Sequence, residues 1–234
     1  MDLGDRIKKY ESMTVTRLIP KMAAIIRLDG KAFHTLTKGM DRPWDGNFVA
    51  SMQLTAYHLC AGIQGAVFGY VQSDEISILL IDWKKYNSTH YFDGKIQKIC
   101  SVSASMATAF FNEEIQKDYP KKRGMFDSRV FNIPKHEIIN YFIWRQQDAS
   151  RNSVQMLARS YFSDKQCFKK SCSDLQDMLM EKGVNWNDTP TTLKRGTAII
   201  KDSKGWKIDN EMPILTQDRK YIKIPELFEG EKTV

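Results

Sequence analysis

The chain has 234 residues, of which 42% are hydrophobic and 27% are charged, and its formal net charge is +7. This balance is typical of a globular protein and excludes an intrinsically disordered chain. No apolar run approaches the roughly 18 residues that a membrane span needs, and the polar start of the chain does not resemble a secretory signal. We therefore expect a cytoplasmic protein with no membrane partner, whose basic excess suits a polyanion.

The chain order of the predicted elements indicates an α+β fold. They are a strand at residues 22–30, a helix at 47–62, a hairpin of strands at 65–71 and 76–81, a helix at 95–116 and a strand at 126–133. This β-α-β-β-α-β order is that of the ferredoxin-like fold. We expect residues 1–135 to form this core.

Residues 136–234 are more helical, and we expect them to form an appended, mostly helical subdomain that packs on the core. The predicted elements here are helices at 137–158 and 173–182 and short strands at 196–200 and 221–224. The cysteines Cys60, Cys100, Cys167 and Cys172 have irregular spacing without a C-x-x-C pair, so we expect reduced thiols and no zinc site.

Two acidic residues follow predicted strand positions that the fold brings together. Asp29 ends the first strand and Asp74 lies in the hairpin turn. In a ferredoxin-like sheet these two positions reach the same edge, so the carboxylates would repel one another unless a cation lies between them. Magnesium takes oxygen ligands and keeps positions open for phosphate, and the Gly30 carbonyl could add a ligand. From the residues alone, the alternative that both acids are ordinary turn residues stays open.

Five motifs resemble those of the histidine-tRNA guanylyltransferase superfamily. In chain order they are Arg27-Leu28-Asp29-Gly30-Lys31-Ala32-Phe33-His34, Gln72-Ser73-Asp74-Glu75-Ile76-Ser77, Phe126-Asp127-Ser128-Arg129, Trp144-Arg145-Gln146-Gln147-Asp148 and Lys194-Arg195-Gly196-Thr197. The resemblance implies a fold related to the palm of polymerases, two Mg²⁺ ions and a homotetramer. It also implies nucleoside triphosphates and tRNA as substrates, with 3′-to-5′ addition of nucleotides to the tRNA 5′ end.

The resemblance further implies roles for individual residues. Asp29, Asp74 and Ser73 resemble the catalytic residues, and Asp29, Gly30 and Asp74 the metal ligands. The residues implied in nucleotide binding are Arg27, Lys31, Ala32, Phe33, His34, Asp45, Lys95 and Lys98. Those implied in RNA binding or in activation of the 5′ end are Arg129, Arg145, Asn152, Lys194 and Arg195. Judged from the residues alone, Lys95 and Lys98 are equally typical of a solvated helix face.

One segment departs from the pattern of the guanylyltransferase branch. Where that branch carries His-Ile-Asn-Asn-Leu-Tyr-Asn, this chain carries residues 150–156, and only Asn152 matches. Ser150-Arg151-Asn152-Ser153 instead resembles the guanylyltransferase-like proteins, whose implied task is template-dependent repair of tRNAs with truncated 5′ ends after activation by ATP or GTP. The alternatives are guanosine addition to histidine tRNA, a palm-type nucleotide cyclase and a non-catalytic RNA-binding module.

Overall fold

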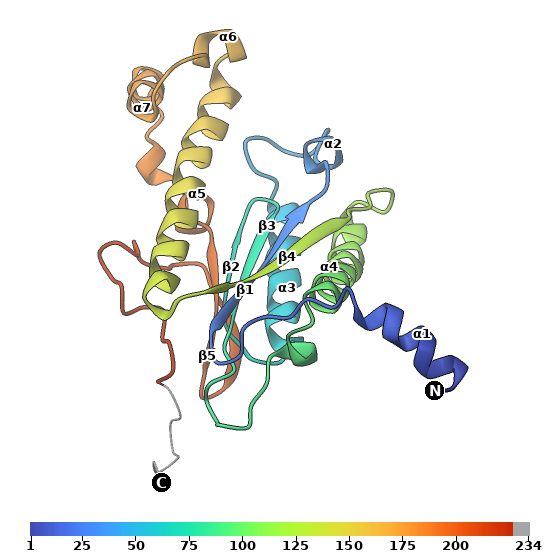
Figure 1. Ribbon diagram of the computed structural model, residues 1–234. Coiled ribbons are helices and arrows are strands. Elements are labelled where there is room, and N and C mark those ends of the chain that lie inside the picture. The colour runs from blue at the N-terminus through green and yellow to red at the C-terminus, as the bar shows by residue number, and fades with distance from the viewer. Residues whose placement is uncertain (227–234) are drawn as a thin grey trace.

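The computed structural model describes residues 1–226, and its centre is a six-stranded antiparallel sheet with the strand order β4-β1-β3-β2-β5-β6 (Figure 1). The strands are β1 (Ala23–Gly30), β2 (Ala66–Gln72), β3 (Glu75–Leu80), β4 (Phe126–Ile133), β5 (Thr197–Asp202) and β6 (Gly205–Asp209). The first four strands have the order β4-β1-β3-β2 of a ferredoxin-like core. The predicted α+β class and the β-α-β-β-α-β order of the first half are confirmed.

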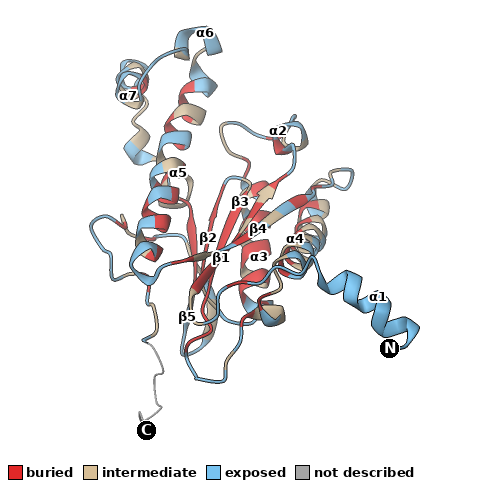
Figure 2. Cartoon of the chain, viewed as in Figure 1, coloured by how far each residue is buried: buried red, intermediate tan, exposed pale blue. Residues whose placement is uncertain are grey.

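Long helices cover both faces of the sheet. α3 (Gly46–Gly62) and α4 (Ile96–Asp118) pack on one face, and α5 (Ile138–Tyr161) packs on the other. The alternation along β1 explains the two layers, because Ala24 and Ile26 join the core beneath α3 and α4, whereas Ile25 joins the core beneath α5. Figure 2 shows that the strands and the inner sides of these helices are buried.

The remaining helices are short. They are α1 (Leu3–Ser12), α2 (Phe33–Leu36), α6 (Asp164–Cys167), α7 (Cys172–Glu181), α8 (Thr191–Arg195) and the 3-10 turns η1 (Tyr91–Gly94), η2 (Lys135–Glu137) and η3 (Trp186–Asp188). α7 packs on the C-terminal part of α5 through a small separate apolar cluster that includes Leu157 and Leu179. α1 has no buried residue and projects from the body of the protein (Figures 1 and 2).

The C-terminal part differs from the sequence prediction in one strand. The strand expected at 196–200 is confirmed as β5, but 221–224 is not a strand, and β5 instead pairs with β6. The hydroxyl of Tyr221 donates to Asp209 at the end of β6, which holds this irregular segment against the sheet. Because β5 also pairs with β2, the sheet of the core continues into the part expected as a subdomain, whose residues 227–234 lie outside the described residues.

Two further predictions concern the whole chain. Among residues 1–226, no helix combines the length and the apolar composition of a membrane span. All four cysteines are free in the structure, and Cys60 is the buried one among them.

Candidate active site

The end of β1 and the hairpin turn between β2 and β3 meet at one end of the sheet. Asp29 lies opposite Glu75 in the antiparallel β1–β3 register, and the Gly30 amide donates a hydrogen bond of 3.0 Å to the Asp74 carbonyl. Ser73 and Asp74 form a two-residue turn, in which Ser73 has a φ of 48°. The structure therefore brings together the residues expected as catalytic and metal-binding.

The two carboxylates at this end are close enough to interact. Burial raises the pKa of the Asp74 carboxyl, and the negative charge of Asp29 raises that pKa further. Hydrogen bonds from the Asp74 amide and from Ser73, together with the charge of His34, oppose this rise without cancelling it. A cation between Asp29 and Asp74 would remove the repulsion.

The donors at this site fit magnesium. The carboxylates of Asp29 and Asp74 and the carbonyl of Gly30 are oxygen ligands, and Mg²⁺ is usually bound by one or two carboxylates together with waters and substrate phosphates. Within residues 1–226, no group of three or more His, Cys, Asp and Glu residues forms a self-sufficient metal centre. Asp29, Asp74 and the Gly30 carbonyl would leave coordination positions open for water and for a phosphate-bearing substrate.

Gly30 is required because an aromatic ring occupies the space beside it. A Cβ atom at Gly30 would lie 2.5 Å from Cγ of Phe33. The Phe33 side chain is only 3% exposed and packs on Phe111 and Phe126, with ring centroids 5.1 Å and 5.0 Å away. Phe33 was expected in nucleotide binding, and its ring mainly anchors the loop that follows Asp29. Ala32 precedes it in the left-handed conformation and is exposed.

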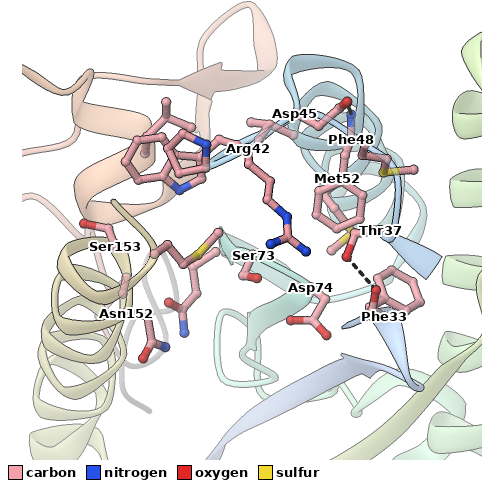
Figure 3. Close-up of a pocket in the computed structure, with 18 of the residues that line it drawn as sticks. Phe33, Thr37, Arg42, Asp45, Phe48, Met52, Ser73, Asp74, Asn152 and Ser153 are labelled. Atoms are coloured by element: carbon pink, nitrogen blue, oxygen red, sulfur yellow. Dashed lines mark hydrogen bonds between the residues drawn. The ribbon is translucent and has the colours of Figure 1, made fainter. Parts of the chain in front are cut away.

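A cavity of about 430 Å³ opens beside Asp74. Its walls come from the loop after β1, the start of α3, the hairpin turn, the middle of α5 and the start of β5. Figure 3 shows Ser73 and Asp74 on one side of this space, Phe48 and Met52 of α3 on another and Asn152 of α5 across from them. Phosphates placed near Asp74 would thus have a partly apolar space beside them of the size that a nucleotide base needs.

Arg42 is a cavity residue that the sequence analysis missed. Its guanidinium points into the cavity toward Ser73 and Asp74 (Figure 3). A lone arginine in a loop gives no spacing signal, and only the folded loop brings it to the site. His34, which is an expected site residue, also lines the cavity and is exposed. Lys31, immediately after Gly30, is exposed as well.

Asp45 lines the cavity, but its carboxylate is occupied by structural hydrogen bonds. It accepts from the Phe48 amide at 2.9 Å, which caps α3, from the Asp41 amide at 3.2 Å, and from the hydroxyl of Tyr119. Burial acts to raise the pKa of Asp45, but these hydrogen bonds outweigh it and hold the pKa below its ordinary value. Asp45 therefore joins the loop after β1 to α3 and to the end of α4.

Two of the expected site residues, Arg27 and Arg145, belong to a cluster of ion pairs behind the acids. Glu75 receives two hydrogen bonds from Arg145, at 2.7 Å and 3.0 Å, and an ion pair from Arg27 at 2.8 Å. Arg145 also pairs with Asp148 at 2.8 Å. Burial raises the pKa of Glu75, and the charges of Arg145 and Arg27 oppose that rise. Glu75, which was not among the expected site residues, is the centre of this cluster. Arg145 fastens α5 to the hairpin, and Arg27 joins β1 to the same carboxylate.

Lys95 and Lys98 lie outside this site, which differs from the sequence expectation. Lys95 directly precedes α4, and its backbone bridges to Arg17, well before β1. α4 covers the face of the sheet opposite α5, and Lys98 stacks on the ring of Phe92, 4.6 Å from the ring centroid. Within one chain these two lysines are remote from Asp29, because α4 begins at the opposite end of the sheet.

The residues expected to bind RNA are scattered. Asn152 lines the cavity, and Arg129 forms an exposed ion pair of 3.2 Å with Asp127 on the edge strand β4. Lys194 is only 8% exposed, because its ammonium donates to the Asn187 carbonyl and lies over the Trp186 ring. The backbone carbonyl of Arg195 accepts a hydrogen bond from the hydroxyl of Tyr70. Lys194 is thus turned inward, which differs from the expectation of an RNA contact.

The chain is similar to known proteins in both sequence and fold. A family model described as tRNAHis guanylyltransferase matches residues 4–134. A structure of a bacterial tRNA(His) guanylyltransferase (Thg1)-like protein in complex with ATP is 46% identical and has a TM-score of 0.91, covering 94% of this chain and 97% of that chain. A second such structure, in complex with GTP, is 41% identical with a TM-score of 0.83 and covers the same shares.

Curated relatives extend the similarity along the chain. The tRNA(His) guanylyltransferase of Saccharomyces cerevisiae is 25% identical over 245 aligned positions, which cover 96% of this chain and 96% of the yeast protein. The family model alone covers more than half of the chain, and it includes both acids at the end of the sheet. The chain therefore belongs to the tRNAHis guanylyltransferase family of nucleotidyltransferases, on its Thg1-like branch.

Proposed function

We propose that the protein adds nucleotides in the 3′-to-5′ direction to the 5′ end of tRNA, copying the opposite strand of the acceptor stem. The observation that carries this proposal is that Asp29 and Asp74 interact at one end of the sheet, where Asp74 lines a cavity of nucleotide size. Similarity to Thg1-like proteins solved with ATP and with GTP supports a nucleoside triphosphate as the occupant of the cavity. The net charge of +7 suits tRNA as the second substrate.

The proposed site includes two Mg²⁺ ions held by Asp29, Asp74 and the Gly30 carbonyl. When bound, such ions lower the pKa of an attacking hydroxyl and stabilise charge on the transferred phosphate. The protein itself contributes position and charge. Gly30 and Asp74 are fixed to each other by a main-chain hydrogen bond, and Arg42, His34 and Lys31 place positive or hydrogen-bonding groups near the phosphates.

The proposed reaction has two phosphoryl transfers. A 5′-monophosphate on the RNA first attacks the α-phosphate of ATP or GTP, which releases pyrophosphate and leaves an activated end. The 3′-hydroxyl of the incoming nucleotide then attacks the 5′-phosphate, and AMP or GMP leaves. Both steps need aligned phosphates more than they need a covalent intermediate on the protein. The proposed Ser73 role is to hold the Asp74 carboxylate by its hydrogen bond.

Templated repair is the favoured form of the activity. In the guanylyltransferase branch the segment at 150–156 carries a histidine, whereas this chain has Ser150-Arg151-Asn152-Ser153. Asn152 and Ser153 both line the cavity, so the departure falls at the site itself. The family resemblance also suggests a homotetramer, and in such an assembly the remote Lys95 and Lys98 would have to act on a neighbouring subunit's site.

The direct test is nucleotide incorporation. Transcripts of tRNA that lack one or more 5′ nucleotides are incubated with Mg²⁺, ATP and labelled nucleotides, and the product is sequenced. We expect added bases to follow the opposite strand, and Asp29→Asn and Asp74→Asn to lose incorporation by at least roughly a hundredfold. Asp177→Asn, an exposed acid on α7, is the matched control and should retain activity.

The same experiment separates the alternatives. A single guanosine added only to histidine tRNA, whatever base lies opposite, would identify a guanylyltransferase and reject templated repair. A cyclic nucleotide formed without RNA would identify a cyclase. Binding of tRNA without any incorporation, with both Asp variants binding like the wild type, would identify an RNA-binding module.

A further inference from the structure

The end of α5 and the segment after it enclose a second cavity, of about 320 Å³. Its lining includes Arg159 near the end of α5, Asp164 and Cys167 of α6, and Lys169 and Lys170 before α7. Figure 1 shows that this end of α5, with α6 and α7, extends beyond the sheet. Three of these five side chains carry a positive charge, so the cavity attracts anions.

An exposed aromatic ring lies beside these cations. The Phe168 side chain is 70% exposed, although it is large and apolar. The ammonium of Lys169 lies 5.4 Å from the centroid of this ring, and Lys169 has a φ of 58°. A ring that is accessible to a base, next to lysines that are accessible to phosphates, is the combination by which proteins bind unpaired nucleotides.

Arg159 links this cavity to the candidate active site, because its side chain lines both. It forms an ion pair of 3.4 Å with Asp164, in which both side chains are more than half exposed. Arg159 follows Asn152 of the active-site cavity by seven residues, or about 10 Å along the helix. One RNA molecule can therefore contact both cavities.

We propose that Arg159, Phe168, Lys169 and Lys170 form a docking site for the tRNA substrate, in which the cations bind backbone phosphates and Phe168 stacks on an unpaired base. The inference rests on the proposed function, since it assumes that the same RNA is the substrate at Asp29 and Asp74. Unpaired bases in tRNA occur in its loops and at its 3′ end, so the site binds RNA by shape and stacking and not by reading a sequence.

Charge substitution tests the phosphate contacts. The double variant Lys169→Gln/Lys170→Gln is compared with Lys84→Gln/Lys85→Gln, an adjacent exposed pair in the loop that follows β3 at the opposite end of the sheet. Fluorescence anisotropy with labelled tRNA measures Kd as a function of salt. We expect the first variant to raise Kd roughly 5- to 20-fold and to reduce the slope of log Kd against log salt by about 1.5, with little change in the control. Equal Kd values and slopes for the two double variants would overturn the docking site.

Three single variants test the stacking by Phe168 and the restraint of Arg159 by Asp164. Phe168→Ala is expected to raise Kd for tRNA roughly tenfold, whereas Phe168→Tyr keeps the aromatic face and wild-type affinity. Asp164→Asn removes the negative charge beside Arg159 and should lower Kd. Equal losses in Phe168→Ala and Phe168→Tyr, or weaker binding by Asp164→Asn, would contradict the arrangement.

The docking site and the proposed function can fail separately. If tRNA binds through these residues but is never extended, the proposed function fails and the docking site stands. If truncated tRNA is extended while the variants at Phe168, Lys169 and Lys170 bind it as the wild type does, the docking site fails and the function stands. Affinity for ATP without RNA should be the same in all these variants, and a loss there would show that the substitutions disturb the active-site cavity instead.

Discussion

The Gly30 amide donates a hydrogen bond to the carbonyl oxygen of Asp74, so the end of β1 and the hairpin turn are joined by their main chains. This contact fixes the two acids relative to one another before any substrate binds. Catalytic groups on rigid elements keep their geometry better than groups on free loops. The Gly30 carbonyl, which we propose as a further metal ligand, belongs to the same short segment.

Substitution of Gly30 should disturb this segment. In Gly30→Ala the new methyl group would lie 2.5 Å from Cγ of the Phe33 ring, and the ring is too tightly packed to move freely. We expect a loss of about 1–3 kcal/mol in the free energy of unfolding and a loss of nucleotide incorporation. Gly46→Ala at the start of α3 has open space around the new Cβ and serves as the control. Unchanged stability of Gly30→Ala would show that the Phe33 ring can move to make room for the methyl group.

Metal binding should be visible in thermal unfolding. Mg²⁺ that binds only the folded wild-type protein raises Tm by mass action, and Asp74→Asn should remove most of that rise. Without metal, Asp74→Asn should have a higher Tm than the wild type, because it removes a partly buried carboxylate that Asp29 repels. Each 1 kcal/mol corresponds to about 2–4 °C for a protein of this size. A metal-free Asp74→Asn with a lower Tm would contradict this view of the site.

Removal of the Glu75 charge should lower the free energy of unfolding much more than removal of a surface charge. Glu75→Gln leaves the buried guanidinium of Arg145 and the partly buried guanidinium of Arg27 without their common carboxylate. We expect a loss of about 3–5 kcal/mol in unfolding free energy, measured with denaturant. Arg151→Gln, which removes an exposed ion pair with Asp148, should cost no more than about 1 kcal/mol. Similar losses of unfolding free energy in the two variants would show that the Glu75 cluster stabilises the protein no more than an exposed ion pair does.

The Asp45 cap should give a stability difference that depends on pH. Asp45→Ala removes the hydrogen bonds to Phe48 and Tyr119, with an expected loss of about 1–2 kcal/mol at pH 7. Because the pKa of Asp45 lies below its ordinary value in the folded state, this contribution is fully present above about pH 4 and is lost as the pH falls through the folded-state pKa. Unfolding curves of both proteins between pH 7 and pH 3 measure it. A difference that grows on acidification would refute the assignment.

The sequence predicts the core of the site because its signals are local. The apolar run that ends in Asp29 and Gly30 and the two runs around Ser73 and Asp74 each indicate strands by themselves, and the chain order then implies that they meet. The hairpin turn itself fixes Gln72 opposite Glu75 in the β2–β3 pair. These predictions needed no knowledge of distant contacts.

The positions that differ from expectation have a common cause in long-range packing. Lys95 and Lys98 stand at a plausible helix face, but the direction in which α4 crosses the sheet decides which end they reach. Lys194 was expected to face RNA, and contacts with Trp186 and Asn187 turn it inward. Arg42 enters the cavity only through the path of its loop. No spacing in the sequence contains this information.

The pairing of β5 with β2 and of Arg145 with Glu75 has a consequence for any attempt to divide the protein. A fragment that stops at residue 135 would leave the outer edge of β2 unpaired and Glu75 with Arg27 as its one remaining cation. It would also lack the α5 wall of the cavity. The two halves of the chain are thus interdependent, and truncation is expected to give an aggregating strand edge in place of a minimal enzyme.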